Sequence, residues 1–333
     1  MGDDDGTKGC FWIMTSPKIG LALGGGIARG WAHIGVLQRL KELGVVPDLI
    51  AGTSMGALIG GIFLTGELDR FEGLVSALNR FRVVRLLDFM VSNNGVIGGK
   101  RLFRELDKIV GDVKIEQLDM PFTAVATELN TGHELWISEG CLLDAIRASV
   151  SLPGIFKPVS LNGRWMIDGA LVNPVPVSVC RAMGARMVIA VNLTADTMGG
   201  VPVIDRRNSD AGCDGAPYNG VERRKNGRDK LGSAMRHFLA AEQEEPSFFG
   251  TMASSFNILL DRITRSRLAG DPPDVSIAPR LGHLSLLDFH RADEAIEEGR
   301  HAVDRVVPEL RGVLGAFGGQ TEQRERPQLA QAD

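Results

Sequence analysis

The chain has 333 residues, of which 44% are hydrophobic and 23% are charged, and these fractions exclude a disordered protein. Its net charge of -4 at pH 7 argues against a nucleic-acid partner, which requires a basic excess. No run reaches the roughly 18 apolar residues of a membrane span, and the acidic N-terminus is unlike a secretory signal. The four cysteines are scattered, so they predict neither a disulfide framework nor a zinc site.

Short apolar strands, glycine-rich turns and helices alternate along the chain. This alternation is typical of a parallel sheet covered by helices. In chain order we predict a strand at 18–23, a helix at 28–43, a strand at 47–51, an apolar helix ending at 66, strands at 122–128 and 133–137, a short helix at 144–150, strands at 164–168 and 187–193, helices at 232–244 and 248–268, a strand at 274–277 and a helix at 291–306.

Composition divides the chain into five parts. They are a disordered leader (1–17), a core (18–195), a polar flexible insertion (196–232), a C-terminal helical region packing on the core (233–312) and a disordered tail (313–333). The predicted helix over 248–268 is amphipathic. A helix of the core or of a homodimer is favoured, and the alternative is an interfacial helix in peripheral contact with a membrane.

The turn that follows the second strand matches the nucleophile elbow, G-x-S-x-G. Ser54 is flanked at two residues on either side by Gly52 and Gly56, and an apolar helix follows. Such a turn is so tight that it needs small residues at those positions, and it holds the serine hydroxyl out at the edge of the sheet. The alternative is a structural turn in which Ser54 only caps the helix.

The turn after the first strand is also rich in glycine. Gly24, Gly25 and Gly26 precede a helix that carries Arg29 in its first turn. A dinucleotide-binding loop would require G-x-G-x-x-G, and Arg29 stands where the last glycine should be. The residues fit better an oxyanion hole, whose backbone amides would face Ser54 because consecutive parallel strands end at the same edge of the sheet.

A carboxylate at the end of a strand supplies a base for the serine. Asp168 ends the strand over 164–168 and begins the tripeptide Asp168-Gly169-Ala170, so a Ser–Asp dyad without imidazole is predicted. The alternative is that Asp168 has only a structural role, as a turn-forming residue. A second Asp-Gly-Ala begins at Asp214, but it lies in the polar insertion with no strand before it.

The competing hypothesis is a Ser–Asp–His triad completed by His283 or His290. His283 follows a loop signal and His290 precedes a charged helix, so neither sits in a glycine-rich or strand-end context. We interpret most of the six histidines as surface or capping residues. A dyad also predicts a pH profile without a limb near the ordinary histidine pKa of about 6.5. The histidines show no spacing typical of a metal site.

These motifs together resemble the patatin-like phospholipases, in particular the bacterial branch similar to neuropathy target esterase. The resemblance lies in residues 20–30, 52–56, 149–159 and 168–177, spans about 18–195 and resumes at 274–302. It implies a three-layer α/β/α fold with a mainly parallel central sheet, making 18–195 a catalytic core. By position, Ser54 would be the nucleophile and Asp168 the base.

The resemblance further implies hydrolysis of acyl esters in phospholipids or lysophospholipids, without a cofactor or metal. Gly24, Gly25 and Gly26 would form the oxyanion hole, and Arg29 would hold this loop. We expect a cytoplasmic protein that reaches lipids at the inner face of the membrane. Two alternatives stay open: a catalytically weak or inactive regulatory protein on the same fold, and a nucleotide-binding oxidoreductase.

Overall fold

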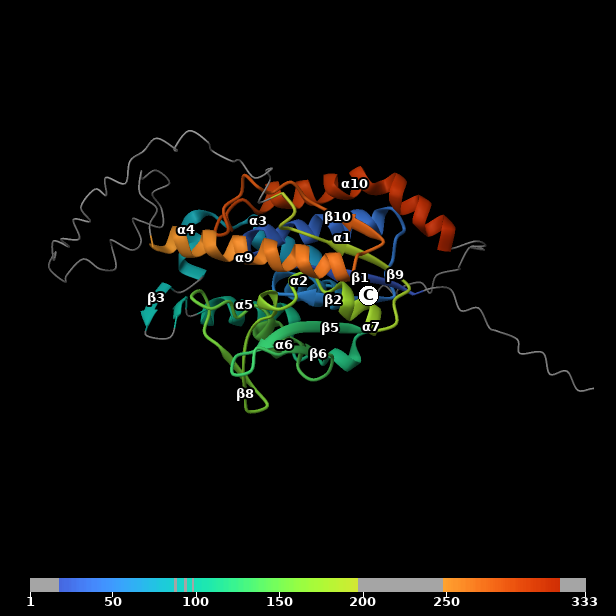
Figure 1. The fold of residues 1–333 in the computed structure, drawn as a ribbon. Helices are drawn as coiled ribbons and strands as arrows, with labels where there is room; N and C mark the ends of the chain where they lie inside the picture. The colour runs from blue at the N-terminus through green and yellow to red at the C-terminus, as the bar shows by residue number, and fades with distance from the viewer. Residues whose placement is uncertain (1–17, 87–88, 93–94, 98, 197–247, 318–333) are drawn as a thin grey trace, which may run out of the picture.

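The computed structural model describes residues 18–86, 89–92, 95–97, 99–196 and 248–317 (Figure 1). The predicted leader, most of the polar insertion and the helix predicted at 232–244 lie outside these residues. The strands are β1 Ile19–Leu23, β2 Leu49–Thr53, β3 Phe89–Ser92, β4 Gly95–Ile97, β5 Phe122–Glu128, β6 Glu134–Ile137, β7 Val159–Leu161, β8 Arg164–Asp168, β9 Met187–Val191 and β10 Val275–Ile277.

The helices surround these strands. The α-helices are α1 Ala32–Glu42, α2 Met55–Leu64, α3 Leu68–Ser76, α4 Arg80–Leu86, α5 Lys100–Val110, α6 Leu142–Ser149, α7 Val177–Ala182, α9 Phe248–Gly270 and α10 Ala292–Phe317. Three short 3-10 helices are η1 Ile27–Trp31, η2 Ile115–Gln117 and η3 Gly169–Leu171. The predicted helix at 28–43 thus begins as η1 and continues as α1.

An eight-stranded sheet forms the centre of the molecule. Its order is β10-β9-β1-β2-β5-β8-β7, with β6 also paired to β5. The five strands from β10 to β5 are parallel, whereas β6, β7 and β8 are antiparallel to their neighbours. The predicted mainly parallel α/β fold is confirmed.

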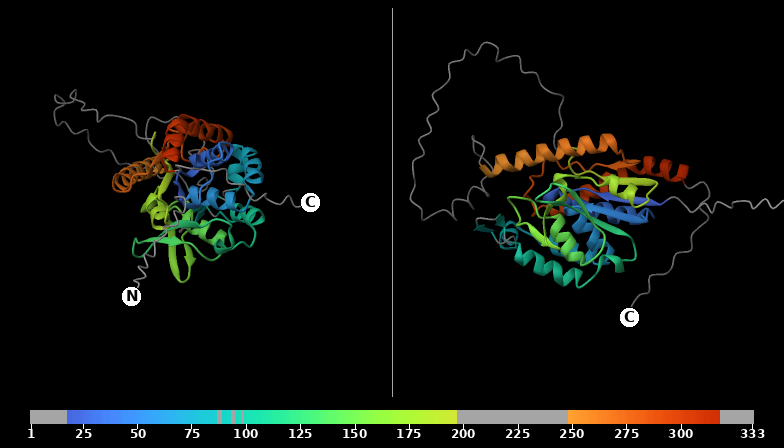
Figure 2. Two further views of the ribbon diagram at one scale, coloured as in Figure 1. Left: turned by 90° about the vertical axis from the view of Figure 1, so that its right-hand side faces the viewer. Right: turned by 60° about the horizontal axis from the view of Figure 1, so that its bottom comes forward.

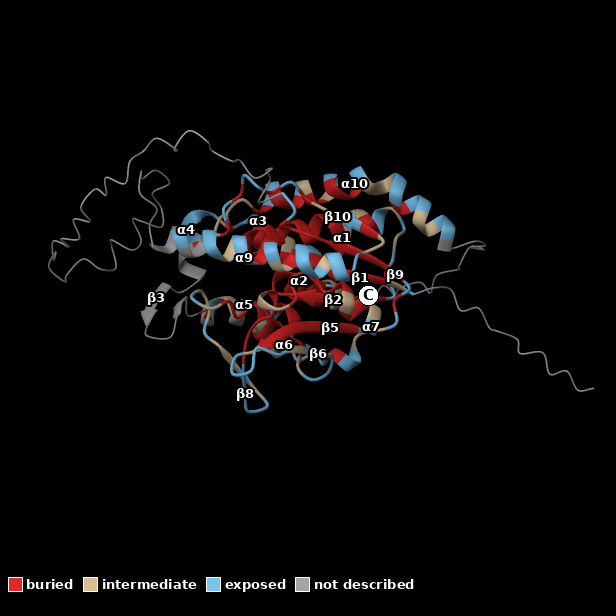
Figure 3. Cartoon of the chain, in the orientation of Figure 1, coloured by how far each residue is buried: buried red, intermediate tan, exposed pale blue. Residues whose placement is uncertain are grey.

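Side chains of alternate strand residues point to opposite faces of the sheet, and each face has its own helices. In β1, Leu21 and Leu23 join the larger core, which includes residues of α1, α2 and α10. Ala22 joins a smaller core formed with residues of α7. The half-buried Leu268 of α9 packs against this core. Figure 3 shows the buried sheet between exposed helical surfaces, so the fold has three layers.

Helices α1 and α10 pack with their backbones in close approach. A Cβ atom at Gly35 would collide with the Ile296 carbonyl, and one at Gly299 would collide with the Ala32 carbonyl. Both glycines are therefore required by the packing of this pair. Helix α10 covers α1, and β10 is the outermost strand on one side of the sheet. The C-terminal region therefore completes the core.

Helix α10 continues to Phe317, so residues 313–317 are helical and the tail predicted from 313 begins too early. The reason is that Val313 and Leu314 pack against the core, at helical spacing from the buried Leu310. The remainder of the predicted tail lies outside the described residues.

Helix α9 lies across one face of the sheet (Figure 1 and Figure 2). It buries Leu260, Asp261 and Thr264, while Ile258 and Leu259 are about half exposed. The helix therefore contributes to the core, as the favoured interpretation expected. Within the described ranges, no helix is both long enough and apolar enough to cross a bilayer.

Candidate active site

The elbow and the glycine-rich loop begin side by side because β1 and β2 are adjacent and parallel. Leu23 of β1 pairs with Gly52 of β2, so the two strands end at the same level. The predicted proximity of the two turns follows from this register. A Cβ atom at Gly25 would lie 3.4 Å from the Cβ of Ser54, which shows how closely the loop approaches the serine.

Ser54 has the strained backbone of a nucleophile elbow. Its φ of 54° and ψ of -122° lie in a region that residues with side chains rarely adopt, at a cost of about 1–3 kcal/mol. A Cβ atom at Gly52 would lie 2.6 Å from the Ala57 backbone, and one at Gly56 would collide with the Leu23 carbonyl. The predicted need for small residues on both sides of Ser54 is therefore a packing requirement.

A buried hydroxyl holds the backbone of Ser54 in place. The Ser54 amide donates to Oγ of Ser149 at 2.8 Å, and this hydroxyl donates to the Val125 carbonyl of β5 at 2.6 Å. Ser149 is fully buried at the end of α6. Its contact with Ser54 was not predicted, although Ser149 begins one of the runs that carry the family resemblance.

Strand β8 brings Asp168 to Ser54 from the opposite direction. On β5, β2 pairs up to Val125, β8 pairs from Ala126 onward, and β6 pairs over both of these residues. Because each flank of a strand accepts one partner, β6 occupies one flank and β2 and β8 share the other, end to end. Asp168 thus lies at the expected edge, but on an antiparallel strand.

Ser54 and Asp168 are in direct contact. Oγ of Ser54 donates to Oδ2 of Asp168 at 2.7 Å, and the Ala170 amide donates to Oδ1 at 2.8 Å. The two side chains are buried, with Ser54 4% exposed and Asp168 1% exposed. Burial raises the pKa of Asp168 from 3.8 to about 7, and the bonds from Ser54 and Ala170 partly oppose this shift.

Two of the three predicted oxyanion donors are already engaged. The Gly24 amide donates to the Val191 carbonyl at 3.1 Å, and the Gly25 amide donates to the Pro174 carbonyl at 2.9 Å. Their amides therefore hold the loop against its neighbours instead of facing a substrate. The Gly26 amide makes no hydrogen bond to another residue that the structure describes.

A buried histidine of α1 forms a hydrogen bond with the glycine-rich loop. His33 is fully buried in α1, and its Nε2 lies 2.7 Å from the Gly24 carbonyl. Burial lowers the pKa of His33 to about 4, so the ring is neutral and Nε2–H donates to Gly24. Nδ1 has no hydrogen-bond partner among the described residues. His33 is thus not among the histidines at the surface or at a cap, and its spacing from Leu37 and Leu40 indicates the buried face of the helix.

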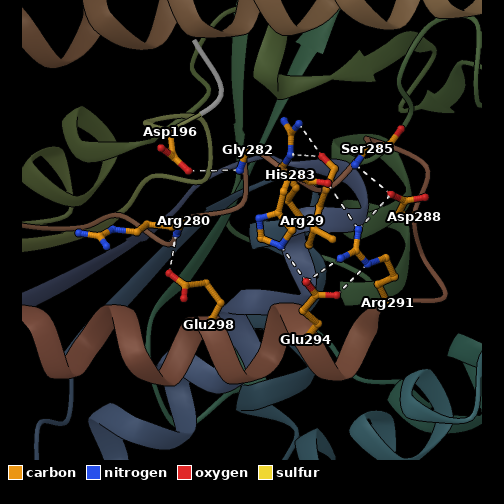
Figure 4. Close-up of polar contacts among 11 residues, drawn as sticks. Arg29, Asp196, Arg280, Gly282, His283, Ser285, Asp288, Arg291, Glu294 and Glu298 are labelled. Atoms are coloured by element: carbon orange, nitrogen blue, oxygen red, sulfur yellow. Dashed lines mark hydrogen bonds and ion pairs between the residues drawn. The ribbon is translucent and has the colours of Figure 1, made fainter. Parts of the chain in front are cut away.

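Arg29 ties the glycine-rich loop to the C-terminal part of the chain (Figure 4). Its Nε and Nη2 donate to the Leu284 carbonyl at 3.0 and 2.7 Å, and Nη1 donates to Oδ1 of Asn257 in α9 at 3.1 Å. Burial lowers the pKa of the Arg29 guanidinium, and the carboxylates of Asp196 and Asp288 oppose that shift. The predicted holding role agrees with this geometry.

An apolar cavity extends from the serine into the helices. Its empty volume is about 790 Å³, a figure that includes the part open to solvent, and Ser54 and Asp168 are the two polar residues among the twenty described residues that line it. The apolar walls come from α2, α3, α5 and α6 and include Leu58, Phe71, Phe103 and Ile146. Such a lining fits a hydrocarbon chain.

The residues of the competing hypotheses lie elsewhere. His283 contacts Glu294 at 2.7 Å, and His290 accepts from Nε of Arg80, so neither completes a triad with Ser54. Asp214 lies outside the described residues. Among those described, no three His, Cys, Asp or Glu side chains gather to hold a metal ion.

Comparison with known proteins agrees with these motifs. A family model described as patatin-like phospholipase matches residues 21–181. An uncharacterized NTE family protein of Mycobacterium tuberculosis is 33% identical over 86% of this chain and 90% of the relative. Lysophospholipase NTE1 of Saccharomyces cerevisiae is 33% identical over 54% of this chain, but only 11% of that longer protein is covered. The solved structure of VipD from Legionella pneumophila aligns with a TM-score of 0.43 and 13% identity, covering 88% of this chain and 67% of VipD.

Proposed function

The chain belongs to the patatin-like phospholipase family, on the branch of the NTE family proteins, and we propose that it hydrolyses acyl esters of phospholipids or lysophospholipids with Ser54 as nucleophile and Asp168 as base. The observation that carries this proposal is the 2.7 Å hydrogen bond from Ser54 Oγ to Asp168 at the end of an apolar cavity. A carboxylate at this distance can accept the serine proton directly.

The first half-reaction forms an acyl-enzyme. Ionised Asp168 accepts the proton of Ser54 as Oγ bonds to the ester carbonyl carbon, and the carbonyl oxygen becomes an oxyanion. The Gly26 amide and the Met55 amide at the start of α2 are the donors proposed for this oxyanion. When the tetrahedral intermediate collapses, the ester C–O bond breaks and the leaving alkoxide takes the proton from Asp168.

The second half-reaction restores the enzyme. Asp168 accepts a proton from water as the hydroxide oxygen attacks the acyl carbon. The bond to Ser54 Oγ then breaks, and Oγ regains its proton from Asp168 while the fatty acid leaves. The two hydrogen bonds that Asp168 accepts, from Ser54 and from the Ala170 amide, support its repeated use in one orientation.

The cavity supports a long acyl chain as the part of the substrate that is recognised. Among the described residues that line it, Asp168 is the one charged group, which disfavours sugars and charged peptides. The mycobacterial relatives are uncharacterized, and the yeast relative is named a lysophospholipase, which favours an ester with a single acyl chain.

Fatty-acid release from lysophosphatidylcholine and from phosphatidylcholine vesicles tests the proposal. We expect release by the native protein and none above background by a folded Ser54→Ala variant. Equal release by the two proteins would refute Ser54 as the nucleophile. No release from either lipid by the native protein would favour the inactive regulatory alternative.

A further inference from the structure

A basic surface with an exposed aromatic residue lies close to the acyl cavity. Residues 80–108 carry seven Lys and Arg against three Asp and Glu, although the chain as a whole has a net charge of -4. Within this segment, Arg80, Arg82, Arg101 and Arg104 are exposed. Phe81 is 80% exposed between two of these arginines on α4. Among the exposed large apolar side chains of the described residues, Phe81 has the greatest exposed fraction.

The arginines line a cleft between α3 and α5. Its lining consists of Leu74, Ala77, Leu78, Arg82, Arg101, Arg104 and Glu105, around an empty volume of about 1340 Å³. Glu105 is the acidic residue among the described residues of this lining. Its carboxylate forms an ion pair with Nζ of Lys108, which is not part of the lining, at 2.9 Å. The cleft therefore brings together the guanidinium groups of three arginines, which suits phosphate groups.

The cleft and the acyl cavity share two leucines. Leu74 of α3 and Leu78, which follows α3, line both spaces, and both side chains are half-buried. A lipid phosphate held in the cleft would thus lie next to an apolar route toward Ser54. This continuity favours a lipid over an acidic protein or a nucleic acid, because neither of these carries an acyl chain that could enter the cavity.

We propose that the surface formed by α3, α4 and α5 docks on an anionic phospholipid bilayer, with lipid phosphates at the arginine-lined cleft and Phe81 inserted among the acyl chains. Basic residues attract the anionic surface, and an aromatic ring is stabilised at the boundary between headgroups and chains. The use of this surface to deliver a substrate rests on the proposed function, whereas docking itself does not.

Vesicle co-sedimentation tests the docking surface directly. The probes are vesicles of phosphatidylcholine alone and of phosphatidylcholine mixed with phosphatidylglycerol. The variants are Phe81→Ser and the double variant Arg101→Gln/Arg104→Gln, all at exposed positions. The matched controls lie near the amino-terminal ends of the parallel strands. They are Val46→Ser, 52% exposed, and the double variant Lys41→Gln/Arg186→Gln, both at exposed positions.

We expect the native protein to bind the anionic vesicles more tightly than the neutral ones. The double arginine variant should bind the anionic vesicles at least tenfold more weakly, since each basic side chain near such a surface contributes roughly fivefold. Phe81→Ser should also weaken binding, and the controls should bind like the native protein. For both surface variants, the ratio of vesicle hydrolysis to hydrolysis of a short soluble ester should fall by about tenfold.

Three outcomes would overturn the proposal. They are equal binding of neutral and anionic vesicles, native-like binding by both surface variants, and equal losses in the controls. A loss confined to Ile258→Ser, on the exposed apolar part of α9, would move the docking surface there. Failure of the native protein to hydrolyse any ester would refute the proposed function but leave the binding experiment valid.

Discussion

Ser54 and Asp168 meet because β2 and β8 approach each other end to end along the same flank of β5. Thr53 pairs with Val125 and Asp168 pairs with Ala126, so the serine that follows β2 faces the residue that ends β8. The contact joins residues 114 positions apart in the chain. Its geometry therefore depends on strand pairing as well as on the two local turns.

The first prediction concerns the base. Asp168→Asn should lower fatty-acid release by about 10²–10⁴-fold, since an amide cannot accept the Ser54 proton. Asp214→Asn changes the other Asp-Gly-Ala sequence and should keep full activity. Rates measured on lysophosphatidylcholine for both variants provide the comparison. Equal activities would reject Asp168 as the base.

The same substitution should stabilise the fold at neutral and higher pH. Because the folded-state pKa of Asp168 is raised from 3.8 to about 7, the folded protein binds the extra proton between these values, and stability falls as pH rises through this window. Asp168→Asn removes a cost of up to about 4 kcal/mol above pH 7 and little near pH 4. Melting temperatures of both proteins near pH 8 and pH 4 measure this difference. A lower melting temperature for the variant near pH 8 would contradict the buried-carboxylate interpretation.

The pH dependence of activity should show the same carboxylate. Since the reaction requires ionised Asp168, kcat/KM for a soluble ester should rise through about pH 7 and level off above it. Because burial moves the pKa of Asp168 into this range, we now expect a limb here that belongs to the carboxylate and not to a histidine. The limb should persist in His283→Ala and His290→Ala. Its disappearance from either variant would favour a triad.

Ser149 is predicted to act as a positioning residue. Ser149→Ala leaves the Ser54 amide and the Val125 carbonyl buried without this partner, at a cost of roughly 1–3 kcal/mol for each unsatisfied group. We expect a lower kcat with little change in KM, and recovery in Ser149→Thr. Ser151→Ala is the matched control, because Ser151 is equally buried but donates to the Arg147 carbonyl. Equal effects on kcat at both positions would show that Ser149 acts only through stability.

His33 is predicted to position the glycine-rich loop. His33→Leu keeps much of the side-chain volume but removes the donor to the Gly24 carbonyl, so kcat should fall by about tenfold, the effect of losing roughly 1.4 kcal/mol in the transition state. His33→Gln can donate again and should recover most of the rate. Because the pKa of His33 is about 4, neither variant should shift the limb near pH 7. A shifted limb would show that His33 takes part in proton transfer.

Local patterns predicted the strands and turns around the serine. The strands predicted at 18–23, 122–128 and 187–193 are confirmed as β1, β5 and β9. They could be predicted because buried parallel strands are short apolar runs bounded by turn residues. The antiparallel direction of β8 could not be read from the sequence, since an apolar run carries no direction. Asp168 was placed at the correct edge because a strand of either direction can end there.

The cavity and the loop donors depend on long-range packing that no local pattern contains. No element was predicted between Gly66 and 122, where α3, α4 and α5 supply the cavity walls and the basic cleft. Likewise, the glycine pattern could not show that Gly24 and Gly25 donate to Val191 and Pro174, which are far away in the chain. Sequence therefore predicted which residues meet, and packing decides which of their atoms remain available.

The Ser54 nucleophile is tested most directly by the identity of the side chain that a fluorophosphonate modifies, found by mass spectrometry of peptides from the labelled protein. We expect one modified peptide carrying the phosphonyl group on Ser54, and no labelling of a folded Ser54→Ala variant. Labelling on another residue, or undiminished labelling of Ser54→Ala, would contradict this assignment.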